Sequence, residues 1–412
     1  MTRIAIVGAG AIGLATGYSL RRRGHEVLIL DSGPPGAGCT RGNAGWITPS
    51  ISSPVPAPGL TLKSIKWMLR PDSPLYLAPS ALPGLARWLW RFWRFCNPRD
   101  FVAGLRATAA LNQSTLAAFD ALERDGVRIE LHRRGLLFVF LDPRESEPVL
   151  AEFEHYRDFG YGIPEPLDGE ALRRMEPGLS NAVRAGFHVP EEYHVRPESL
   201  AAGYVARIGE LGGVIRSGVQ VTGARSTGDR ITGLDTSAGL VEADEFLIAA
   251  GARTGELVRR FGPSLPVEAG KGYSLTMTTG GPVFSRPLYL GEAKIGCSPF
   301  DGAVRFAGTM ELSGINERFD RRRMEGLRNA IGRYFDGSFQ LHGEEWVGMR
   351  PLAPDGLPLL GRVPGFRNLS VATGHSMLGI TLAPATGEAM ADLLSGQPVP
   401  VLEPFAPGRF NW

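Results

Sequence analysis

The stretch IAIVGAGAIGLATGYSLRRRGHEVLILDS, residues 4–32, decides the fold that this sequence predicts. It opens on a short apolar run rich in β-branched side chains, which is typical of a buried parallel strand. Gly8, Gly10 and Gly13 follow in the spacing G-x-G-x-x-G. In that spacing the first glycine permits a tight turn, the second lets the backbone approach a pyrophosphate, and the third permits close packing of a helix on the strand. The stretch therefore predicts a dinucleotide-binding turn.

The residues after the glycines complete this unit. A helix is expected to end near Gly24, and its first backbone N–H groups, at Ala11 and Ile12, would face the phosphates. A second apolar strand ends at Asp31, whose carboxylate can accept hydrogen bonds from a ribose hydroxyl, and Ser32 follows beside it. This fingerprint predicts a dinucleotide but does not by itself separate NAD from FAD.

Length and composition favour two domains in a globular chain. The 412 residues are 43% hydrophobic and 21% charged, with a formal net charge of +2. This balance favours neither a disordered chain nor a nucleic-acid-binding protein. The three cysteines lie far apart and no Cys/His spacing suggests a metal site, so we expect no metal. Because no apolar run is long enough to span a membrane and no leader is visible, we expect a cytoplasmic protein.

Two internal segments support a parallel sheet built from separated parts of the chain. Residues 195–222 are predicted to form a helix, a glycine stop and a strand, with Val219 near its cofactor end. Residues 242–254 form an apolar strand pattern that ends at Ala250 and Gly251. Both segments would place small residues beside the dinucleotide.

The last such unit is NLSVATGHSMLGITLAPATGEAMADLLSG, residues 368–396. It predicts a strand, a glycine turn, and a helix that ends at Gly396. Its candidate cofactor contacts are Gly374, Gly379, Ile380 and Thr381.

A polar, small-residue loop, GCTRGNAGWITPS at 38–50, follows the second strand. A glycine-lined loop at this point suggests close backbone contact with a ring system larger than nicotinamide. Asn43, Ala44 and Gly45 are its candidate residues.

These pieces together resemble the FAD-dependent amine and amino-acid oxidoreductases of the D-amino-acid oxidase superfamily. Within it, the chain is most similar to the D-amino-acid dehydrogenase small-subunit and hydroxyproline dehydrogenase types. Asp31 departs from the Glu that many members carry, and both side chains can reach a ribose. Besides the opening motif, the segments that carry the resemblance are NAGWITPS (43–50), APGLTLKSIKWML (57–69), GKGYS (270–274), GMRPLAPDGLPLLG (348–361) and GHSMLGITLAPATG (374–387).

The resemblance implies non-covalently bound FAD and an α/β fold. A Rossmann-like FAD domain would be interleaved with an α+β substrate domain built on a large mixed sheet. We expect the FAD domain to comprise 1–54, 176–262 and 346–412, and the substrate domain 55–175 and 263–345. A single dinucleotide fingerprint also suggests that the substrate itself is the reductant.

The resemblance implies three candidate substrate-site residues. Arg350, in the motif that begins at Gly348, would grip the substrate carboxylate, a task suited to a bidentate guanidinium. The phenol of Tyr273 could donate to the same carboxylate, and the alternative is a half-buried core tyrosine. His375 could act as a general base, although a structural or capping role is favoured over it.

The predicted function is oxidation of a D-amino acid or cyclic imino acid, such as D-proline or cis-4-hydroxy-D-proline, by hydride transfer from Cα to flavin. A primary imine product hydrolyses to a 2-oxo acid, whereas a proline-type substrate gives a cyclic imine. The alternatives are a glycine- or sarcosine-type amine oxidase that uses oxygen, and a flavin subunit that only relays electrons. The acceptor would be a quinone, a carrier or oxygen.

Residues 81–101, ALPGLARWLWRFWRFCNPRDF, predict an amphipathic helix of unusual composition. Apolar and aromatic side chains fall on one side over 85–96, and three arginines fall opposite. Such a helix can lie at the inner face of a membrane, or it can pack its aromatics inward against the substrate domain. Both interpretations remain open from the sequence alone.

Overall fold

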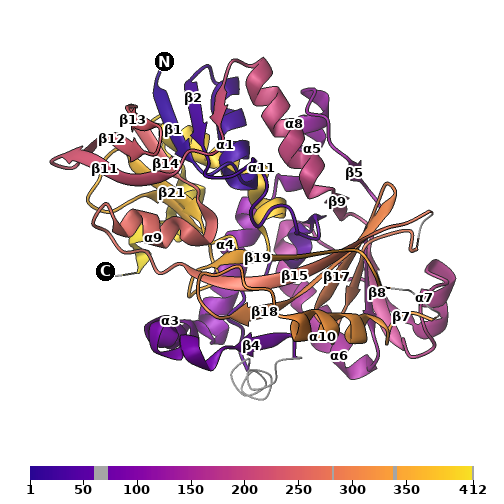
Figure 1. Ribbon diagram of the computed structural model, residues 1–412. Helices are drawn as coiled ribbons and strands as arrows, with labels where there is room; N and C mark the ends of the chain where they lie inside the picture. Colours follow the sequence, from indigo (N-terminus) through magenta and orange to yellow (C-terminus); the bar gives the residue numbers. More distant parts are fainter. Residues whose placement is uncertain (60–72, 281–282, 337–340, 411–412) are drawn as a thin grey trace.

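The structure is a computed structural model that describes residues 1–59, 73–280, 283–336 and 341–410. Most of the resembling segment 57–69 therefore lies outside the described residues. Within them the chain builds two principal sheets, which occupy the upper left and the lower right of Figure 1.

The first sheet has six strands and contains the opening motif. Its first five strands in the sheet are mutually parallel, and β20 runs antiparallel to β21 at one edge. In spatial order the strands are β10 (Val214–Arg216), β2 (Glu26–Leu30), β1 (Arg3–Val7), β14 (Glu245–Ile248), β21 (Leu369–Thr373) and β20 (Leu359–Arg362).

Both faces of this sheet are covered, which explains the continuous apolar runs of its strands. Ile4 and Ile6 of β1 face a core shared with three helices, whereas Ala5 and Val7 face a core shared with a small antiparallel sheet and α9 (Thr254–Arg259). The three helices are α1 (Ala11–Arg22), α8 (Pro197–Glu210) and α11 (Gly379–Leu394). The small sheet contains β11 (Val221–Thr227), β12 (Arg230–Thr236) and β13 (Gly239–Val241).

The second sheet has nine strands and is mixed, as expected. Parallel pairs join β16 to β6 and β18 to β4, and the other pairs are antiparallel. Its main path runs through β19 (Glu344–Leu352), β15 (Glu268–Thr278), β18 (Ala303–Leu312), β17 (Ile295–Phe300), β16 (Leu288–Leu290), β6 (Leu136–Phe140), β8 (Ala185–Val189) and β7 (Pro166–Asp168), while β4 (Leu75–Leu77) pairs with β18.

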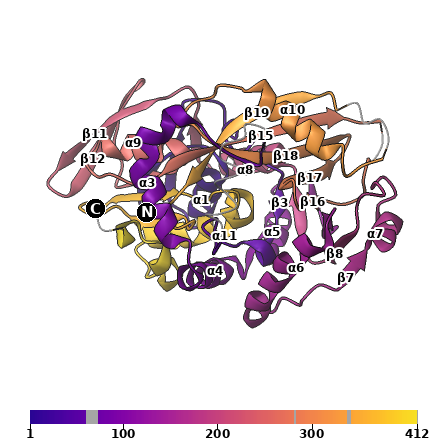
Figure 2. The same cartoon turned by 90° about the horizontal axis from the view of Figure 1, so that it is seen from below.

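Helix α10 (Arg321–Ile331) covers one face of the nine-stranded sheet, and the other face is turned toward the six-stranded half (Figure 1 and Figure 2). Alternation along β15 produces this division, because Tyr273, Leu275 and Met277 pack into the core that α10 shares. The smaller elements are α6 (Pro143–Glu152), α7 (Gly169–Met175), and a three-stranded sheet of β3 (Trp46–Ile47), β9 (Tyr193–Val195) and β5 (Leu131–His132).

Sheet membership cuts across the expected domain ranges at several places. Strand β8 lies within 176–262 and β19 lies mostly within 346–412, two ranges expected in the FAD domain, yet both strands belong to the nine-stranded sheet. Helices α4 (Pro98–Asn112) and α5 (Thr115–Arg124) contribute to the core of α1 and α11. The expected division into two domains stays a prediction.

The aromatic segment forms helix α3 (Leu82–Phe95), whose two sides differ sharply in exposure. Leu85 and Trp88 are buried, and the Trp88 indole donates to the carbonyl of Pro266 at 3.1 Å. By contrast Trp90 and Trp93 are 54% and 59% exposed. Trp88 is therefore a packing residue, and the aromatic side chains do not form one continuous face.

Candidate functional site

The glycine turn lies at the carboxyl ends of the parallel strands and lines a cavity of ≈ 520 Å³, called here the glycine-turn cavity. The carboxyl edge of an open parallel sheet is where dinucleotides bind. The predicted cofactor residues that line it are Gly8, Gly10, Ala11, Ile12, Asp31, Ser32, Asn43, Val219, Ala250, Gly251, Gly348, Gly379 and Ile380.

Steric constraints explain two of the motif glycines. Gly8 has φ +112°, and a Cβ there would stand 2.3 Å from the carbonyl oxygen of Ala249. A Cβ on Gly13 would stand 1.9 Å from the carbonyl oxygen of Gly8, so α1 can cross β1 only when this residue is glycine. Gly10 occupies the N-cap of α1, which turns the positive end of the helix dipole toward the cavity.

The carboxylate of Asp31 helps to shape this turn. Its Oδ2 accepts a hydrogen bond from the Ala9 backbone N–H at 2.7 Å, and its Oδ1 accepts one from Gly33 at 2.8 Å. An ionised carboxylate has acceptor capacity for about four hydrogen bonds, so Asp31 can still accept from ribose hydroxyls.

Three of the predicted cofactor residues, all glycines, line neither cavity. They allow the backbone to pack closely or to turn sharply. Gly13 serves the helix crossing. Gly45 has φ +76°, and a Cβ there would stand 2.0 Å from the carbonyl oxygen of Val195. Gly374 has φ +80° in the turn before α11. These residues shape the site without facing its contents.

A second cavity of ≈ 710 Å³ adjoins the first and is called here the Arg350 cavity. Ala44 and Thr381 line it, as do Arg350 and Tyr273. The two cavities have several lining residues in common, so they are direct neighbours. The shared residues are Cys39, Asn43, Trp346, Gly348 and Ser376.

Arg350 lies on β19 at the edge of the nine-stranded sheet, in the extended backbone that the following proline favours. Its Nη1 donates to the carbonyl of Thr309 at 2.6 Å. Among the described residues no carboxylate pairs with it. Burial lowers the pKa of the guanidinium, which nevertheless stays cationic at neutral pH. A desolvated cation without a counter-ion attracts an anionic ligand strongly.

The space for this guanidinium comes from Gly272 on the neighbouring strand. A Cβ at Gly272 would stand 2.3 to 2.6 Å from the guanidinium atoms of Arg350. The two glycines of GKGYS therefore matter for their missing side chains, since Gly270 pairs directly with Arg350 across the strands.

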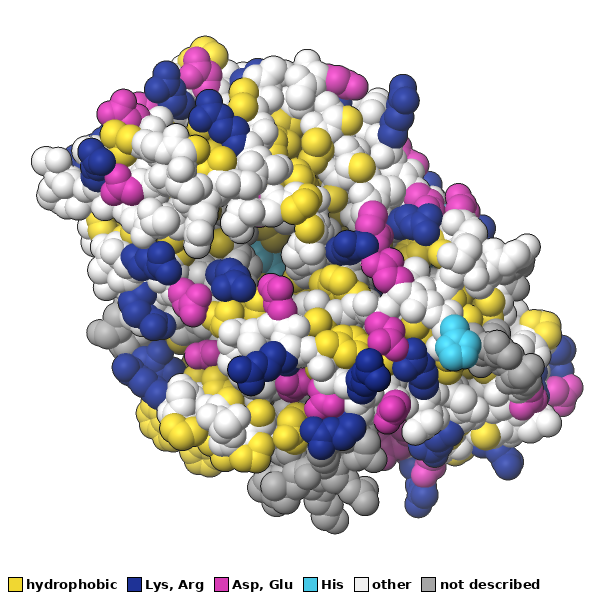
Figure 3. Space-filling view, viewed as in Figure 1, with side chains coloured by type: hydrophobic (Ala, Val, Ile, Leu, Met, Phe, Trp, Pro, Cys, Tyr) yellow, Lys and Arg dark blue, Asp and Glu magenta, His cyan; other side chains and the backbone are white. Residues whose placement is uncertain are grey.

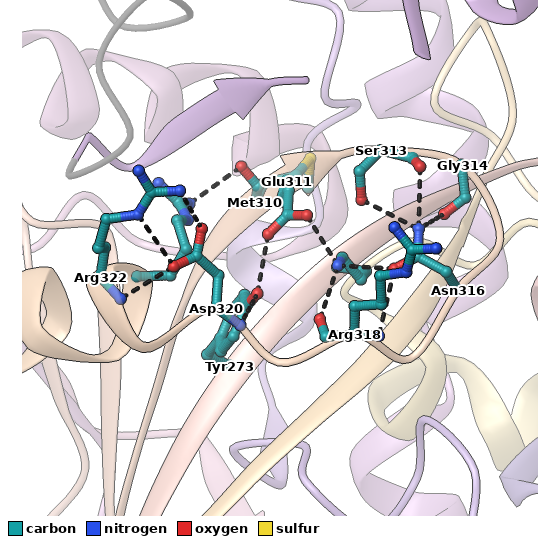
Figure 4. A network of polar contacts seen from close by, with 11 residues as sticks. Tyr273, Met310, Glu311, Ser313, Gly314, Asn316, Arg318, Asp320 and Arg322 are labelled. Carbon is teal, nitrogen blue, oxygen red and sulfur yellow. Dashed lines mark hydrogen bonds and ion pairs between the residues drawn. The ribbon is translucent and has the colours of Figure 1, made fainter. Parts of the chain in front are cut away.

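The Tyr273 hydroxyl, predicted to donate to the substrate carboxylate, donates to another group in this structure, so its contact with a substrate stays a prediction. Figure 4 shows the hydroxyl directed at Glu311, to whose Oε2 it donates at 2.8 Å, and it accepts from the Asp320 N–H at 3.3 Å. Burial and the bond to Glu311 raise the pKa of Tyr273. Lys271 pairs with the same carboxylate at 2.7 Å. The alternation of β15 turns this network toward α10.

His375 lines the glycine-turn cavity, and Arg350 lines the other one. It is 3% exposed, and its Nε2 lies 3.2 Å from the hydroxyl of Thr386. Burial lowers the pKa of His375 to about 3, so the ring is neutral at neutral pH. Helix α11 begins at Gly379 and not at His375, because Ser376 takes φ +52° and breaks the helical backbone.

Several lining residues escaped sequence reasoning. The loop 33–40 covers the glycine-turn cavity, and the Thr40 hydroxyl accepts from the Ala11 N–H at 3.1 Å. The Trp346 indole occupies the space beside Gly42 and Gly348, where an added Cβ would meet the ring at 1.8 Å. The glycine-rich composition of 33–42 was a usable signal for the loop, whereas nothing local marked Trp346.

One group of described residues has the composition of a metal site. Ligand atoms of Glu130, His132 and Asp301 lie within 4.8 Å of one another. Arg196 already binds the second oxygen of Glu130 at 2.9 Å, which supplies the positive charge that a metal would bring. The group lies on the β5 and β9 side, and none of its members lines either cavity.

The two cavities fit FAD. The glycine turn, the N-terminus of α1 and Asp31 suit the adenosine and pyrophosphate. Asn43 and Gly348 line both the glycine-turn cavity and the neighbouring Arg350 cavity, which has room for a flat ring system and a small anion.

Comparisons with known proteins agree with this geometry. The profile of a family described as FAD dependent oxidoreductase matches residues 3–393. A D-amino acid dehydrogenase from Granulibacter bethesdensis is 31% identical over 407 residues, which is 96% of each chain. The chain belongs to this family and is an FAD-dependent oxidoreductase, so the predicted family, fold class and cofactor are confirmed.

Solved structures agree in fold. Glycine oxidase from Geobacillus kaustophilus superposes with a TM-score of 0.76 at 24% identity, covering 99% of both chains. Iminodiacetate oxidase from a Chelativorans species gives 0.75 at 23% identity, covering 98% of this chain and 99% of that one.

The neutral state of His375 predicts a pH effect on stability. An unfolded histidine titrates near pH 6.5, whereas the folded ring titrates near 3. Between these values the unfolded chain binds the extra proton, so the free energy of unfolding falls as the pH drops, by up to about 1.4 kcal/mol per pH unit. His375→Gln should reduce this slope, measured by urea unfolding between pH 6.5 and 4.5. The exposed His155→Gln is the matched control. An unchanged slope in His375→Gln would show that burial does not lower the pKa of the folded ring.

Proposed function

We propose that the protein oxidises the Cα–N bond of an amino acid or cyclic imino acid, with D-amino acids, D-proline and cis-4-hydroxy-D-proline as the leading candidates. The single observation that carries this proposal is the Arg350 guanidinium, desolvated and without a carboxylate partner among the described residues, in the cavity next to the glycine-turn cavity. A substrate carboxylate would supply the missing negative charge.

The lining of the Arg350 cavity supports a substrate that carries both a carboxylate and an apolar side chain. Trp46, Phe138, Phe153 and Tyr289 line a part of the cavity formed by other elements than β19. The Phe138 and Tyr289 rings lie 5.3 Å apart, centroid to centroid. An apolar or cyclic substrate side chain would lose water favourably against this aromatic wall.

The residues need to do little beyond binding and orientation. Bound FAD supplies the two-electron acceptor for the Cα hydride. Arg350 would hold the carboxylate still, so that the Cα–H bond points at the ring. No side-chain base is required if the substrate amine arrives neutral, and His375 lines the other cavity. The product is an imine, which is hydrolysed to a 2-oxo acid and ammonia when primary and stays cyclic when it comes from a proline.

Anaerobic mixing of the FAD-loaded protein with a panel of D- and L-amino acids tests this proposal. The panel includes glycine, sarcosine, proline and both 4-hydroxyproline isomers. We expect loss of the flavin absorbance with one or more D- or imino acids. Bleaching only by glycine or sarcosine would favour the amine oxidase alternative, and no bleaching at all would favour an electron-relay subunit.

Arg350→Met should raise KM for the bleaching substrate by about 100-fold or more while FAD stays bound, because a charge-assisted bidentate contact is lost. Steady-state kinetics with a dye acceptor measure the change, and the flavin absorbance reports cofactor content. Arg144→Met, at a side chain that is 85% exposed on α6, is the matched control. A wild-type KM in Arg350→Met contradicts the carboxylate assignment.

We further propose that α3 contacts a membrane surface and that the electrons pass to a quinone or carrier there. Hydrophobic side chains gather over α3 at the lower left of Figure 3, next to arginines. Leu82, Trp90 and Trp93 are 44%, 54% and 59% exposed, and Arg94 lies 5.1 Å from the Trp90 ring. The same helix borders the Arg350 cavity through Leu89 and other residues. In the described part of the chain, no helix has the length and apolar character needed to cross a bilayer.

Replacement of Trp90 and Trp93 by serine should lower sedimentation with anionic phosphatidylglycerol vesicles by about tenfold, because interfacial binding scales with buried apolar area. The matched control replaces two exposed apolar residues elsewhere, Val214 and Leu240, by serine. Equal sedimentation of both double variants and the wild type would exclude this membrane contact. A separate measurement identifies the electron acceptor. The rate of oxygen consumption is compared with the rate at which an artificial dye is reduced, and a much faster dye reaction would favour a quinone or carrier over oxygen.

A further inference from the structure

Strand β18 carries a bulge beside Arg350. Between two regular pairs of β15 and β18, two residues of β18, Thr309 and Met310, stand opposite the single residue Gly272. Bulges of this kind occur next to active sites, where they redirect a side chain or a backbone group. The bulge lies where the guanidinium of Arg350 enters its cavity.

The bulge holds Thr309 in a costly backbone conformation. Its φ of +59° lies in the left-handed region, which β-branched residues rarely adopt. In the described part of the chain, three residues other than glycine have positive φ, namely Lys294, Thr309 and Ser376, and all three line the Arg350 cavity. Strain of this sort persists where it serves a site.

The carbonyl and the hydroxyl of Thr309 both lie beside the Arg350 site. The carbonyl oxygen accepts from Arg350 Nη1 at 2.6 Å, which fixes one edge of the guanidinium. The hydroxyl Oγ1 is buried, and it has no hydrogen-bond partner within the described residues. A buried hydroxyl without a partner costs free energy, so such groups in native proteins are normally satisfied by a ligand or by water.

Ser376 shows the same combination of strain and a partnerless buried hydroxyl, but in a different place. It lines both cavities and therefore faces the path of the cofactor. Thr309 lines only the Arg350 cavity and touches Arg350 directly. The position of Thr309 therefore favours a substrate contact.

We propose that Thr309 is a second anchor for the substrate carboxylate. Its hydroxyl donates to a carboxylate oxygen, which can only accept, while its carbonyl keeps the Arg350 guanidinium aligned with the same group. This inference rests on the proposed function, because it takes the ligand of Arg350 to be a carboxylate. Because of the bulge, Thr309 contacts both the substrate carboxylate and the Arg350 guanidinium that binds this carboxylate.

Benzoate, a carboxylate without an amine, is the probe for this contact. Its binding to the FAD-loaded protein is measured by the change in flavin absorbance, with benzamide as the uncharged comparison. Thr309→Val removes the hydroxyl and keeps the β-branched shape, and it should weaken benzoate binding by about tenfold. Thr309→Ser restores the hydroxyl and should bind within about threefold of wild type. Benzamide binding should change little in either variant.

Four further variants decide the interpretation. Thr232→Val, on an exposed strand of the small sheet, should bind benzoate as the wild type does. Arg350→Met should lose benzoate affinity, and Thr309→Val should cost less in that background, because the two contacts share one ligand. If Thr309→Val does not load FAD, Thr309→Gly replaces it, since glycine adopts positive φ freely and also lacks the hydroxyl.

The two proposals fail in different ways. Wild-type benzoate affinity in Thr309→Val or Thr309→Gly, together with a loss in Arg350→Met, overturns the role of Thr309 and leaves the proposed function standing. Wild-type affinity in both the Thr309 and the Arg350 variants overturns the carboxylate site, and both proposals fall with it.

Discussion

The pairing of β19 with β15 is the constraint on which the site depends. Residues of β19 line both cavities: Val347 and Met349 face the glycine-turn cavity, and Arg350 faces the other. The alternation of a strand thus makes one element the partition between the cofactor path and the substrate end. Gly348 and Trp346 line both cavities, and the missing side chain of Gly348 leaves room for the Trp346 indole.

A buried ionic network holds the opposite face of β15 in place. Lys271 and Glu311 form an ion pair with side chains that are 2% and 7% exposed, and Tyr273 bonds to the same carboxylate. Breaking such a pair costs several kcal/mol, since one charge would remain buried alone. Glu311 directly follows the bulge in β18, so the network also fixes the register beyond Thr309. One face of the sheet thus carries the paired charges of Lys271 and Glu311, and the other face carries Arg350, which has no carboxylate partner among the described residues.

The sequence predicted correctly those features that depend on local backbone geometry. The glycine turn, Asp31 and the strand–turn–helix at the end of the chain are each specified by neighbours a few residues apart. It did not foresee the hydrogen bond from Tyr273 to Glu311, because the motif GKGYS shows which residues alternate but not which face of the strand meets Arg350. It also treated the aromatics of α3 as one set, whereas packing buried Trp88 and left Trp90 and Trp93 exposed.

The sequence by itself determined the dinucleotide turn, the family and Arg350 as the residue to test, because each rests on a motif whose chemistry is local. Only the tertiary structure decided the strain at Thr309, the position of Trp346 between Gly42 and Gly348, and the place of His375 in the lining of the glycine-turn cavity. A threonine in a strand looks ordinary in sequence. Its conformation follows from strand pairing over long sequence separations, and no local pattern records that pairing.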